Sequence, residues 1–245
     1  MKENLYIVTG TTKGLGRAFA EQIASDKAND LVSLTRAPSG AIPGGTRIEL
    51  DLADTAAIEK AFDAVEKYIA GKSYAKAVLI NNAAVVTPMG ALDQVAPAEI
   101  ERNIVVNLVA PMLLMRRFLR ATQTVQLRRI INISSGLARR PMFGSGCYCA
   151  SKAGLDMASR AVLVECETRG MAVEVSSLAP GVIDTPMQVA IRGASPEEFV
   201  EVERFKSMKA EGKLRPPGDV AADILRLEAA GKLKGDPIQD LRQLA

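Results

Sequence analysis

Tyr148 and Lys152 are the residues whose types and spacing point most directly to chemistry. They stand four positions apart, and residues so spaced lie on one face of a helix. A neighbouring ammonium favours the charged form of a phenol, so the pair could release and take up a proton. The chain contains no histidine, which excludes Ser-His-Asp hydrolysis and histidine-ligated metals. Proton transfer near neutral pH therefore needs another side chain with a retuned pKa, and this pair is the candidate.

A glycine-rich turn, Thr9-Gly10-Thr11-Thr12-Lys13-Gly14-Leu15-Gly16, follows the first apolar run of the chain. Glycines in such a turn let the backbone approach a pyrophosphate, whose charge the amino end of the next helix stabilises. A plain tight turn would also explain the glycines, but the place between the first strand and the first helix favours a dinucleotide site. The expected cofactor contacts here are Gly10, Thr12, Lys13, Gly14, Leu15 and Gly16.

The end of the second predicted strand, Thr35-Arg36, bears on which dinucleotide would bind. A site for NAD would place Asp or Glu there, to accept hydrogen bonds from the ribose hydroxyls. This chain has Arg36 instead, with Lys13 in the glycine turn. A guanidinium can hold a phosphate through two parallel hydrogen bonds, so the two cations favour NADPH and NADP+. Solvated surface charges are the alternative interpretation.

Short apolar runs alternate with segments of helical periodicity along the chain. The predicted strands comprise residues 5–9, 31–35, 46–50, 76–80, 129–133 and 173–178. The predicted helices comprise residues 15–26, 55–68, 97–122, 147–169 and 217–230. This alternation predicts an α/β fold, a Rossmann-type doubly wound parallel sheet between two layers of helices. A chain of 245 residues would form it as a single domain over residues 1–245.

Polar motifs follow several of the predicted strands at the point where each strand ends. They are Thr9-Gly10, Asn81-Asn82, Ser134-Ser135 and Ala179-Pro180-Gly181. The carboxyl ends of parallel strands lie at one edge of a sheet, where ligands bind in folds of this type. Each motif alone could be an ordinary turn, but their repeated placement predicts one shared crevice.

Composition sets broad limits on function. Hydrophobic residues make up 48% of the chain and charged residues 24%, as in ordinary globular proteins. The net charge of +3 is too small, and the basic residues too dispersed, to indicate nucleic-acid binding. No apolar stretch is long enough for a membrane span, and the amino terminus lacks signal-peptide features, so we expect a cytoplasmic protein. The spacing of Cys147, Cys149 and Cys166 matches neither a zinc site nor a disulfide framework, and no metal site is expected.

Taken together, these residues resemble the motif set of the short-chain dehydrogenase/reductase family. The matching positions are the glycine turn, Asn81-Asn82-Ala83-Ala84, Asn107, Ser135, Tyr148-x-x-x-Lys152 and Pro180-Gly181. Ala84 departs from the pattern, since that family usually has glycine there. Within the family the chain is most similar to the benzil reductases that form (S)-benzoin, near the sepiapterin reductase branch. Residues 107–112, 131–136 and 179–185 carry this finer resemblance, and the segment 204–214 adds to it.

The resemblance implies a role for each of four residues in reducing a carbonyl group. Tyr148 would protonate the carbonyl oxygen as hydride arrives from NADPH, and Ser135 would orient that oxygen. Lys152 would hold the ribose hydroxyls, and Asn107 would steady a water that links Lys152 to solvent. A phenol has a pKa of about 10, and lowering it by three units takes roughly 4 kcal/mol. A cation about 4 Å away, at an effective dielectric near 20, supplies about that much, so Lys152 is the expected cause.

Further cofactor contacts also follow from the resemblance. Asp51 would contact the adenine amino group, with Leu52 against the ring. Thr185 would hold the nicotinamide carboxamide, and Ile183 would offer its backbone to it. Simpler explanations stay open, because Asp51 could cap the next helix and Thr185 could merely precede a proline. The remaining expected contacts are Asn82, Ala83, Pro180 and Gly181.

Two segments, residues 136–146 and 186–208, should close the substrate pocket. Their apolar side chains include Leu137, Met142, Phe143, Met187, Val189 and Ile191. Such flexible apolar contacts suit a small-molecule carbonyl substrate, an aromatic or bulky diketone more than a sugar. The second segment belongs to an expected lid at about residues 183–212. Arg139-Arg140 could favour an acidic substrate or belong to a solvated loop.

The predicted helix at 97–122 is apolar over more of its circumference than one sheet face requires. Proteins similar to this one pair that helix and the Tyr148 helix with their copies in a partner, which implies a homodimer or homotetramer. The leading functional hypothesis is an NADPH-dependent reductase of a ketone or a benzil-like 1,2-diketone. The alternatives are a sepiapterin-type pteridine ketone reductase and a non-catalytic NADP(H)-sensing protein on the same fold.

Overall fold

Seven parallel strands form one sheet in the order β3-β2-β1-β4-β5-β6-β7. The structure is a computed structural model in which residues 2–36 and 45–244 are described. The strands are β1 (Asn4–Thr9), β2 (Asn29–Thr35), β3 (Gly45–Glu49), β4 (Lys76–Asn81), β5 (Leu127–Ile133), β6 (Val173–Ala179) and β7 (Ile238–Asp240). The main helices are α1 (Gly14–Ser25), α2 (Thr55–Ile69), α3 (Pro97–Ile104), α4 (Ala110–Ala121), α5 (Gly146–Thr168), α6 (Pro186–Arg192), α7 (Val202–Ala210), α8 (Pro217–Ala229) and α9 (Leu241–Leu244).

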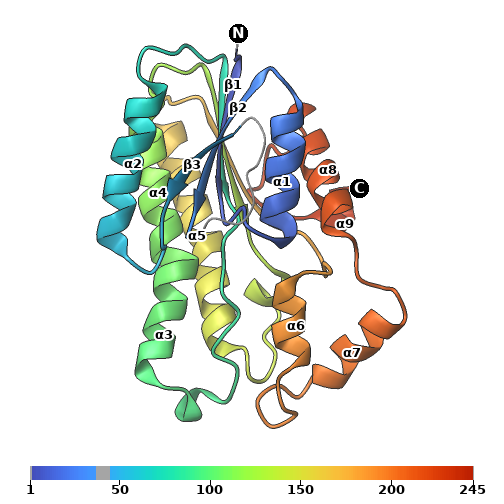
Figure 1. The fold of residues 1–245 in the computed structure, drawn as a ribbon. Coiled ribbons are helices and arrows are strands. Elements are labelled where there is room, and N and C mark those ends of the chain that lie inside the picture. The colour runs from blue at the N-terminus through green and yellow to red at the C-terminus, as the bar shows by residue number, and fades with distance from the viewer. Residues whose placement is uncertain (1, 37–44, 245) are drawn as a thin grey trace.

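Helices cover both faces of the sheet, and each face has its own apolar core (Figure 1). Phe62 on α2 and Phe118 on α4 belong to the core of one face. Phe19 on α1 and Ile224 on α8 belong to the core of the other. Every residue of β2 is buried, as expected of a strand that is covered on both sides. The predicted doubly wound Rossmann-type fold is therefore confirmed.

The strand order reverses between β1 and β4, which are neighbours in the sheet. From β1 the chain moves outward through β2 to β3, and it then returns to the far side of β1 to add β4 to β7. The connections leave this point in opposite directions, so a crevice opens at the carboxyl edge of the two strands. The polar motifs that follow the predicted strands were expected at this edge.

The helix predicted at 97–122 is interrupted. A π turn at Val105–Val109 separates α3 from α4. Asn107 lies in that turn, where its side chain bonds to the backbone of Val85. Such wide turns are frequent at functional sites. Apolar periodicity did not reveal the break, because its cause is a tertiary contact.

The chain beyond β6 contains structure that the sequence did not predict. The expected lid includes two helices, α6 and α7, which lie together below the sheet in Figure 1. β7 adds a seventh strand of three residues to the sheet. In the described part of the chain, no helix is both long and apolar enough to cross a membrane.

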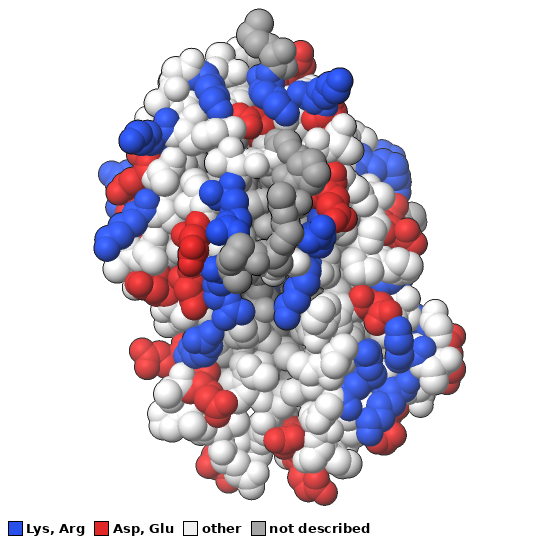
Figure 2. All heavy atoms as spheres, in the orientation of Figure 1, with Lys and Arg blue, Asp and Glu red and all other residues white. Residues whose placement is uncertain are grey.

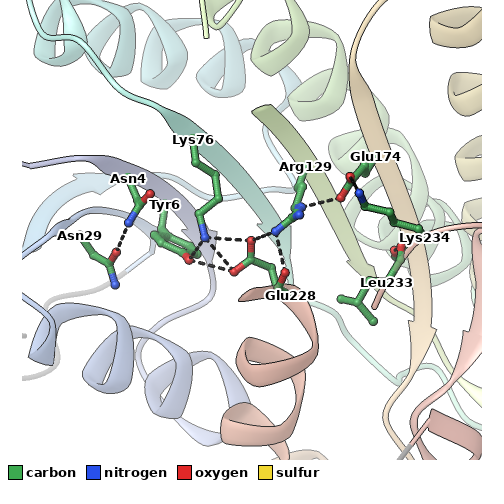
Figure 3. Close-up of polar contacts among 10 residues, drawn as sticks. Asn4, Tyr6, Asn29, Lys76, Arg129, Glu174, Glu228, Leu233 and Lys234 are labelled. Carbon is green, nitrogen blue, oxygen red and sulfur yellow. Dashed lines mark hydrogen bonds and ion pairs between the residues drawn. The ribbon is translucent and has the colours of Figure 1, made fainter. Parts of the chain in front are cut away.

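A buried ion-pair network holds the opposite, amino-terminal part of the sheet (Figure 3). The Glu228 carboxylate on α8 accepts hydrogen bonds from Tyr6 at 2.9 Å, Lys76 at 2.9 Å and Arg129 at 2.5 Å. Arg129 also donates to Glu174 of β6 at 2.5 Å. These contacts join four strands to one helix, and burial beside Glu228 raises the pKa of Tyr6. The network is satisfied within itself, which is what a buried charge requires.

Candidate active site

A cleft of about 690 Å³ runs along the carboxyl edge of the sheet. Its lining includes every cofactor contact expected from the sequence: Gly10, Thr12, Lys13, Gly14, Leu15, Gly16, Arg36, Asp51, Leu52, Asn82, Ala83, Tyr148, Lys152, Pro180, Gly181, Ile183 and Thr185. Ser135 lines it as well. Residues distant in the sequence thus meet in one place because parallel strands end at one edge.

The glycine turn allows a ligand to approach its backbone closely. Gly10 has φ +71°, a conformation that other residues rarely adopt. A Cβ on Gly16 would lie 2.2 Å from the Gly10 carbonyl oxygen, so only glycine fits there. Thr9 Oγ1 accepts hydrogen bonds from the backbone N–H groups of Asn82 at 2.9 Å and Ala83 at 3.0 Å. These bonds lock the turn against the end of β4 and leave a cradle at the start of α1 that fits a pyrophosphate.

The other end of the cleft carries the cations expected to select the dinucleotide. Lys13 and Arg36 are both exposed and line the cleft. Lys and Arg side chains gather near the middle of the face drawn in Figure 2. Lys13 and Arg36 are both cations that can hold a phosphate, and selection of NADP+ over NAD+ by these two residues stays a prediction.

Two simpler explanations from the sequence can be tested here. Asp51 does not cap α2, because Asp54 occupies that position and accepts from the Ala57 N–H at 3.0 Å. Asp51 instead accepts from the Ala53 N–H at 3.0 Å and lines the cleft. Thr185 does precede the proline that opens α6, but its side chain makes no capping bond to that helix. Both positions are therefore compatible with ligand contacts.

Helix α5 presents the proposed acid/base pair to the cleft. Tyr148 is 6% exposed and Lys152 is 2% exposed. The Lys152 ammonium donates to the Ile133 carbonyl at 2.8 Å and lies 5.7 Å from the centre of the Tyr148 ring. Tyr148 is hydrogen-bonded to Ser135. Ser135 Oγ also accepts from the Leu137 N–H at 3.1 Å, which fixes the position of the hydroxyl.

Burial dominates the ionisation of both groups. It raises the pKa of Tyr148 to about 12, and the hydrogen bond with Ser135 opposes this rise without reversing it. Burial likewise lowers the pKa of Lys152 to about 8, against the attraction of the Asp156 carboxylate. The expected depression of the Tyr148 pKa by Lys152 is therefore not a property of the chain by itself. At pH 7 the phenol holds its proton and the amine is charged, which is the form that can donate.

Asn107 lies beneath the cleft rather than in its lining. It is fully buried, accepts from the Val85 N–H at 2.9 Å and donates to the Val85 carbonyl at 2.8 Å. Its amide also reaches Ser151 at 3.2 Å and Asn103 at 3.1 Å. Asn107 thereby joins the π turn to the residue before Lys152. Its expected role toward a water stays a prediction.

The substrate end of the cleft is apolar, with two corrections to the expected lining. Leu137, Met142, Met187 and Ile191 line it as predicted. Phe143 and Val189 do not, because their residues are 52% and 63% exposed. Both side chains therefore face solvent instead of the cleft. Arg140 lines the cleft, whereas Arg139 donates to the Gln239 carbonyl at 3.3 Å.

Several residues of the site were missed by sequence reasoning. Phe205 and Met208 of α7 line the cleft; they lie within the segment 186–208 that was expected to close the pocket, but neither was named as a contact. Asn103 was recognisable only through its four-residue spacing from Asn107. The same spacing from Lys152 marks Asp156, a buried carboxylate that the sequence analysis passed over.

The chain matches known proteins over most of its length. The model of the short chain dehydrogenase family matches residues 4–195. A benzil reductase ((S)-benzoin forming) from Bacillus subtilis is 36% identical over 241 residues, covering 98% of each chain. A sepiapterin reductase from Meriones unguiculatus is 30% identical, covering 90% of this chain and 89% of that protein. A short-chain dehydrogenase/reductase structure from Saccharomyces cerevisiae superposes with a TM-score of 0.84 at 18% identity, over 98% of this chain and 96% of that one.

Proposed function

The chain belongs to the short-chain dehydrogenase family, and from that premise we propose an NADPH-dependent carbonyl reductase that acts on a ketone or benzil-like 1,2-diketone. Membership establishes an oxidoreductase of carbonyl and alcohol groups. The specific cofactor, the substrate and the role of Tyr148 as general acid are the proposal.

One observation carries it most directly. Ser135, Tyr148 and Lys152 line one cleft together with the glycine cradle and two cations, Lys13 and Arg36. Proton donor and dinucleotide cradle share that space, as transfer of hydride and proton to one carbonyl requires. The similarity to a benzil reductase over 98% of the chain supports the choice of substrate class.

The residues present fit NADPH. The glycine turn and the start of α1 would hold the pyrophosphate. Arg36 and Lys13 would hold the 2′-phosphate, and Lys152 the ribose hydroxyls. When bound, NADPH supplies the hydride that reduces the carbonyl carbon.

The proton would come from the chain itself. The Ser135 hydroxyl orients the substrate carbonyl oxygen, and the Tyr148 O–H donates its proton to that oxygen as negative charge develops there. The charged Lys152 then stabilises the phenolate left behind. A protonated phenol beside a charged amine is the resting state that this sequence of events needs. The raised pKa of Tyr148 favours it, and the pKa of Lys152, although lowered by burial to about 8, still leaves the amine charged at pH 7.

An assay of NADPH consumption against a panel of carbonyl compounds tests the proposal. Benzil and sepiapterin should be compared at equal concentrations, with NADH as the cofactor control. Faster turnover of benzil with NADPH is the expected result. Preference for sepiapterin would favour the second candidate, a pteridine ketone reductase, which the 30% identity to a sepiapterin reductase supports. NADPH binding without turnover of any carbonyl would contradict both and leave a sensing protein.

A further inference from the structure

A buried carboxylate lies one helical turn beyond the acid/base pair. Asp156 follows Lys152 on α5 at the same four-residue spacing that separates Lys152 from Tyr148. It is only 7% exposed. Its Oδ1 accepts hydrogen bonds from the hydroxyls of Ser134 and Ser177, each at 2.6 Å. Two short bonds from uncharged donors satisfy the carboxylate oxygen without neutralising its charge.

The Ser134 bond ties Asp156 to the segment that carries the reaction. Ser134 stands between Ile133, whose carbonyl accepts from Lys152 at 2.8 Å, and Ser135, which is bonded to Tyr148. Asp156 therefore binds Ser134, directly after β5, which is the residue between these two contacts. A shift of this strand end would move the acceptor of Lys152 and the partner of Tyr148 together.

Among the charged groups around Asp156, Lys152 is the one whose charge its carboxylate chiefly stabilises. Arg139 Nε lies 3.9 Å from Asp156 Oδ2, but its side chain is partly exposed. Asp240, at the end of β7, is bound by Arg242 at 2.5 Å, so that charge is already balanced. The remaining neighbours named above, Tyr148, Ser135, Ser134 and Ser177, are neutral at pH 7. Lys152 is buried among them, and Asp156 is the carboxylate that favours its charged form.

We propose that Asp156 is a positioning residue of this site, which keeps Lys152 charged through its buried carboxylate and aligns the end of β5 through Ser134. The inference rests on the proposed function for its kinetic consequence alone. A carboxylate that only filled the core would stabilise the fold and leave the ionisation of Lys152 untouched.

Asp156→Asn is the direct test, because it preserves shape and removes the charge. The titration of Lys152 is followed in protein without substrate, by NMR of lysines labelled with ¹³C at Cε, and the Lys152 resonance is assigned by its absence in Lys152→Met. We expect its midpoint to fall by roughly one pH unit, the effect of a nearby charge worth about 1.4 kcal/mol. An unchanged midpoint would overturn the proposal.

The kinetic readout is the pH dependence of kcat/KM for benzil. The alkaline limb, on which Lys152 loses its proton, should move to lower pH in Asp156→Asn by the same amount as the NMR midpoint. Asp30→Asn is the matched control, since Asp30 is also buried and accepts from Tyr74 at 2.6 Å, near the amino end of β2. Asp30→Asn should lower the stability of the fold and leave the alkaline limb at its wild-type pH. An equal shift in both variants would reduce Asp156 to a structural role.

Two further measurements keep the test decisive. Ser134→Ala keeps the charge and cuts the link to β5, so it should lower kcat by about tenfold without moving the Lys152 midpoint. Should Asp156→Asn fail to fold, the carboxyl carbon of Asp156 in the wild type must show the ionised form across the range in which Lys152 titrates. A protonated Asp156 in that pH range would contradict the proposal. A wild type that reduces no carbonyl would refute the proposed function and leave the titration to decide this inference.

Discussion

Tyr148 keeps its proton at neutral pH because burial outweighs the hydrogen bond that would favour the phenolate. A phenol held in this form can serve only as a donor until charge develops on the substrate oxygen. Replacing Tyr148 with Phe removes the proton and little else. We expect turnover of benzil to fall by about 100- to 10,000-fold, the usual worth of a general acid. NADPH affinity, measured by fluorescence titration, should be unchanged, and retention of most activity would rule out this acid.

Lys152 is expected to reduce the stability of the fold that it serves. Burial lowers its pKa from 10.5 to about 8, so the folded chain binds fewer protons than the unfolded chain between these values. The free energy of unfolding that is lost by burying Lys152 is therefore lost in full below pH 8 and is recovered as the pH rises toward 10.5. Lys152→Met should abolish turnover yet raise the free energy of unfolding at pH 7 by about 1–3 kcal/mol. Urea denaturation at several pH values checks this, and a Met variant that is less stable at pH 7 would contradict it.

Arg36 is the residue on which the cofactor preference should depend. Arg36→Asp replaces a phosphate partner by a group that accepts from ribose hydroxyls. We expect the ratio of kcat/KM for NADPH over NADH to fall by about 100-fold or more, as for the loss of a charge-assisted pair worth roughly 3 kcal/mol. Arg47→Asp is the matched control, because Arg47 is an exposed cation on the neighbouring strand β3. An equal change in both variants would indicate a general charge effect.

At the residue scale, what the sequence could predict depended on whether a residue's partners were local. The glycine turn, Arg36 and the Tyr148–Lys152 pair announce themselves by type and spacing, and all of them line the cleft. The direction in which Phe143 and Val189 point could not be foreseen, since loop geometry decides it. The partners of Asp156 are Ser134, just after β5, and Ser177, on β6, so no spacing in the sequence connects them.

Among the elements, the strands were predictable and the interruptions were not. Six of the seven strands were predicted, and those buried on both faces, such as β1 and β4, are short apolar runs between turns. β7 is too short for any periodicity. The π turn at Val105–Val109 exists because Asn107 bonds to Val85 across the fold. Helix α6 has only seven residues, and four of the nine residues of α7 are charged, so neither helix shows a clear apolar periodicity.

Gly144 links the elements around the substrate end. Its carbonyl accepts from the Gly90 N–H at 3.0 Å. It has φ +77°, and a Cβ there would lie 1.9 Å from the Glu198 carbonyl oxygen. Gly144→Ala should therefore cost about 1–3 kcal/mol of stability and displace the lid segment, raising KM for the ketone more than it lowers kcat.

Gly146 provides the control for that substitution. It begins α5, and a Cβ there would meet nothing within 4 Å. Gly146→Ala should leave KM unchanged and add up to about 1 kcal/mol through helix propensity. Thermal denaturation and steady-state kinetics of the two variants check the pair. Equal behaviour would mean that the contact with Glu198 does not position the lid.

For the whole molecule, the two edges of the sheet have different tasks. The amino-terminal part is closed by the ion pairs around Glu228 (Figure 3). The carboxyl edge is left open as the cleft, bounded below by α6 and α7 (Figure 1). Doubly wound topology produces this division, because loops of both halves diverge at one edge only.

The outer faces of α4 and α5 are the proposed surface of assembly. Met112, Met157 and Val164 are large apolar residues exposed on these helices, and Met157 is 64% exposed. We propose that they pair with a second copy of the chain to form a homodimer or homotetramer. Met157→Glu should shift the protein toward the monomer in analytical ultracentrifugation. Val189→Glu, equally exposed but on α6, should not, and a monomeric wild type would refute this interface.

The central claim is that hydride from NADPH and a proton from Tyr148 reach one carbonyl group in this cleft. NADPH carrying deuterium at both positions of the reactive nicotinamide carbon tests it most directly, with benzil as the substrate and mass spectrometry of the product. We predict benzoin with one deuterium on its carbinol carbon, formed at least about 100-fold more slowly by Tyr148→Phe. Benzoin that lacks the label, or labelled benzoin formed at the wild-type rate without the phenol, would contradict it.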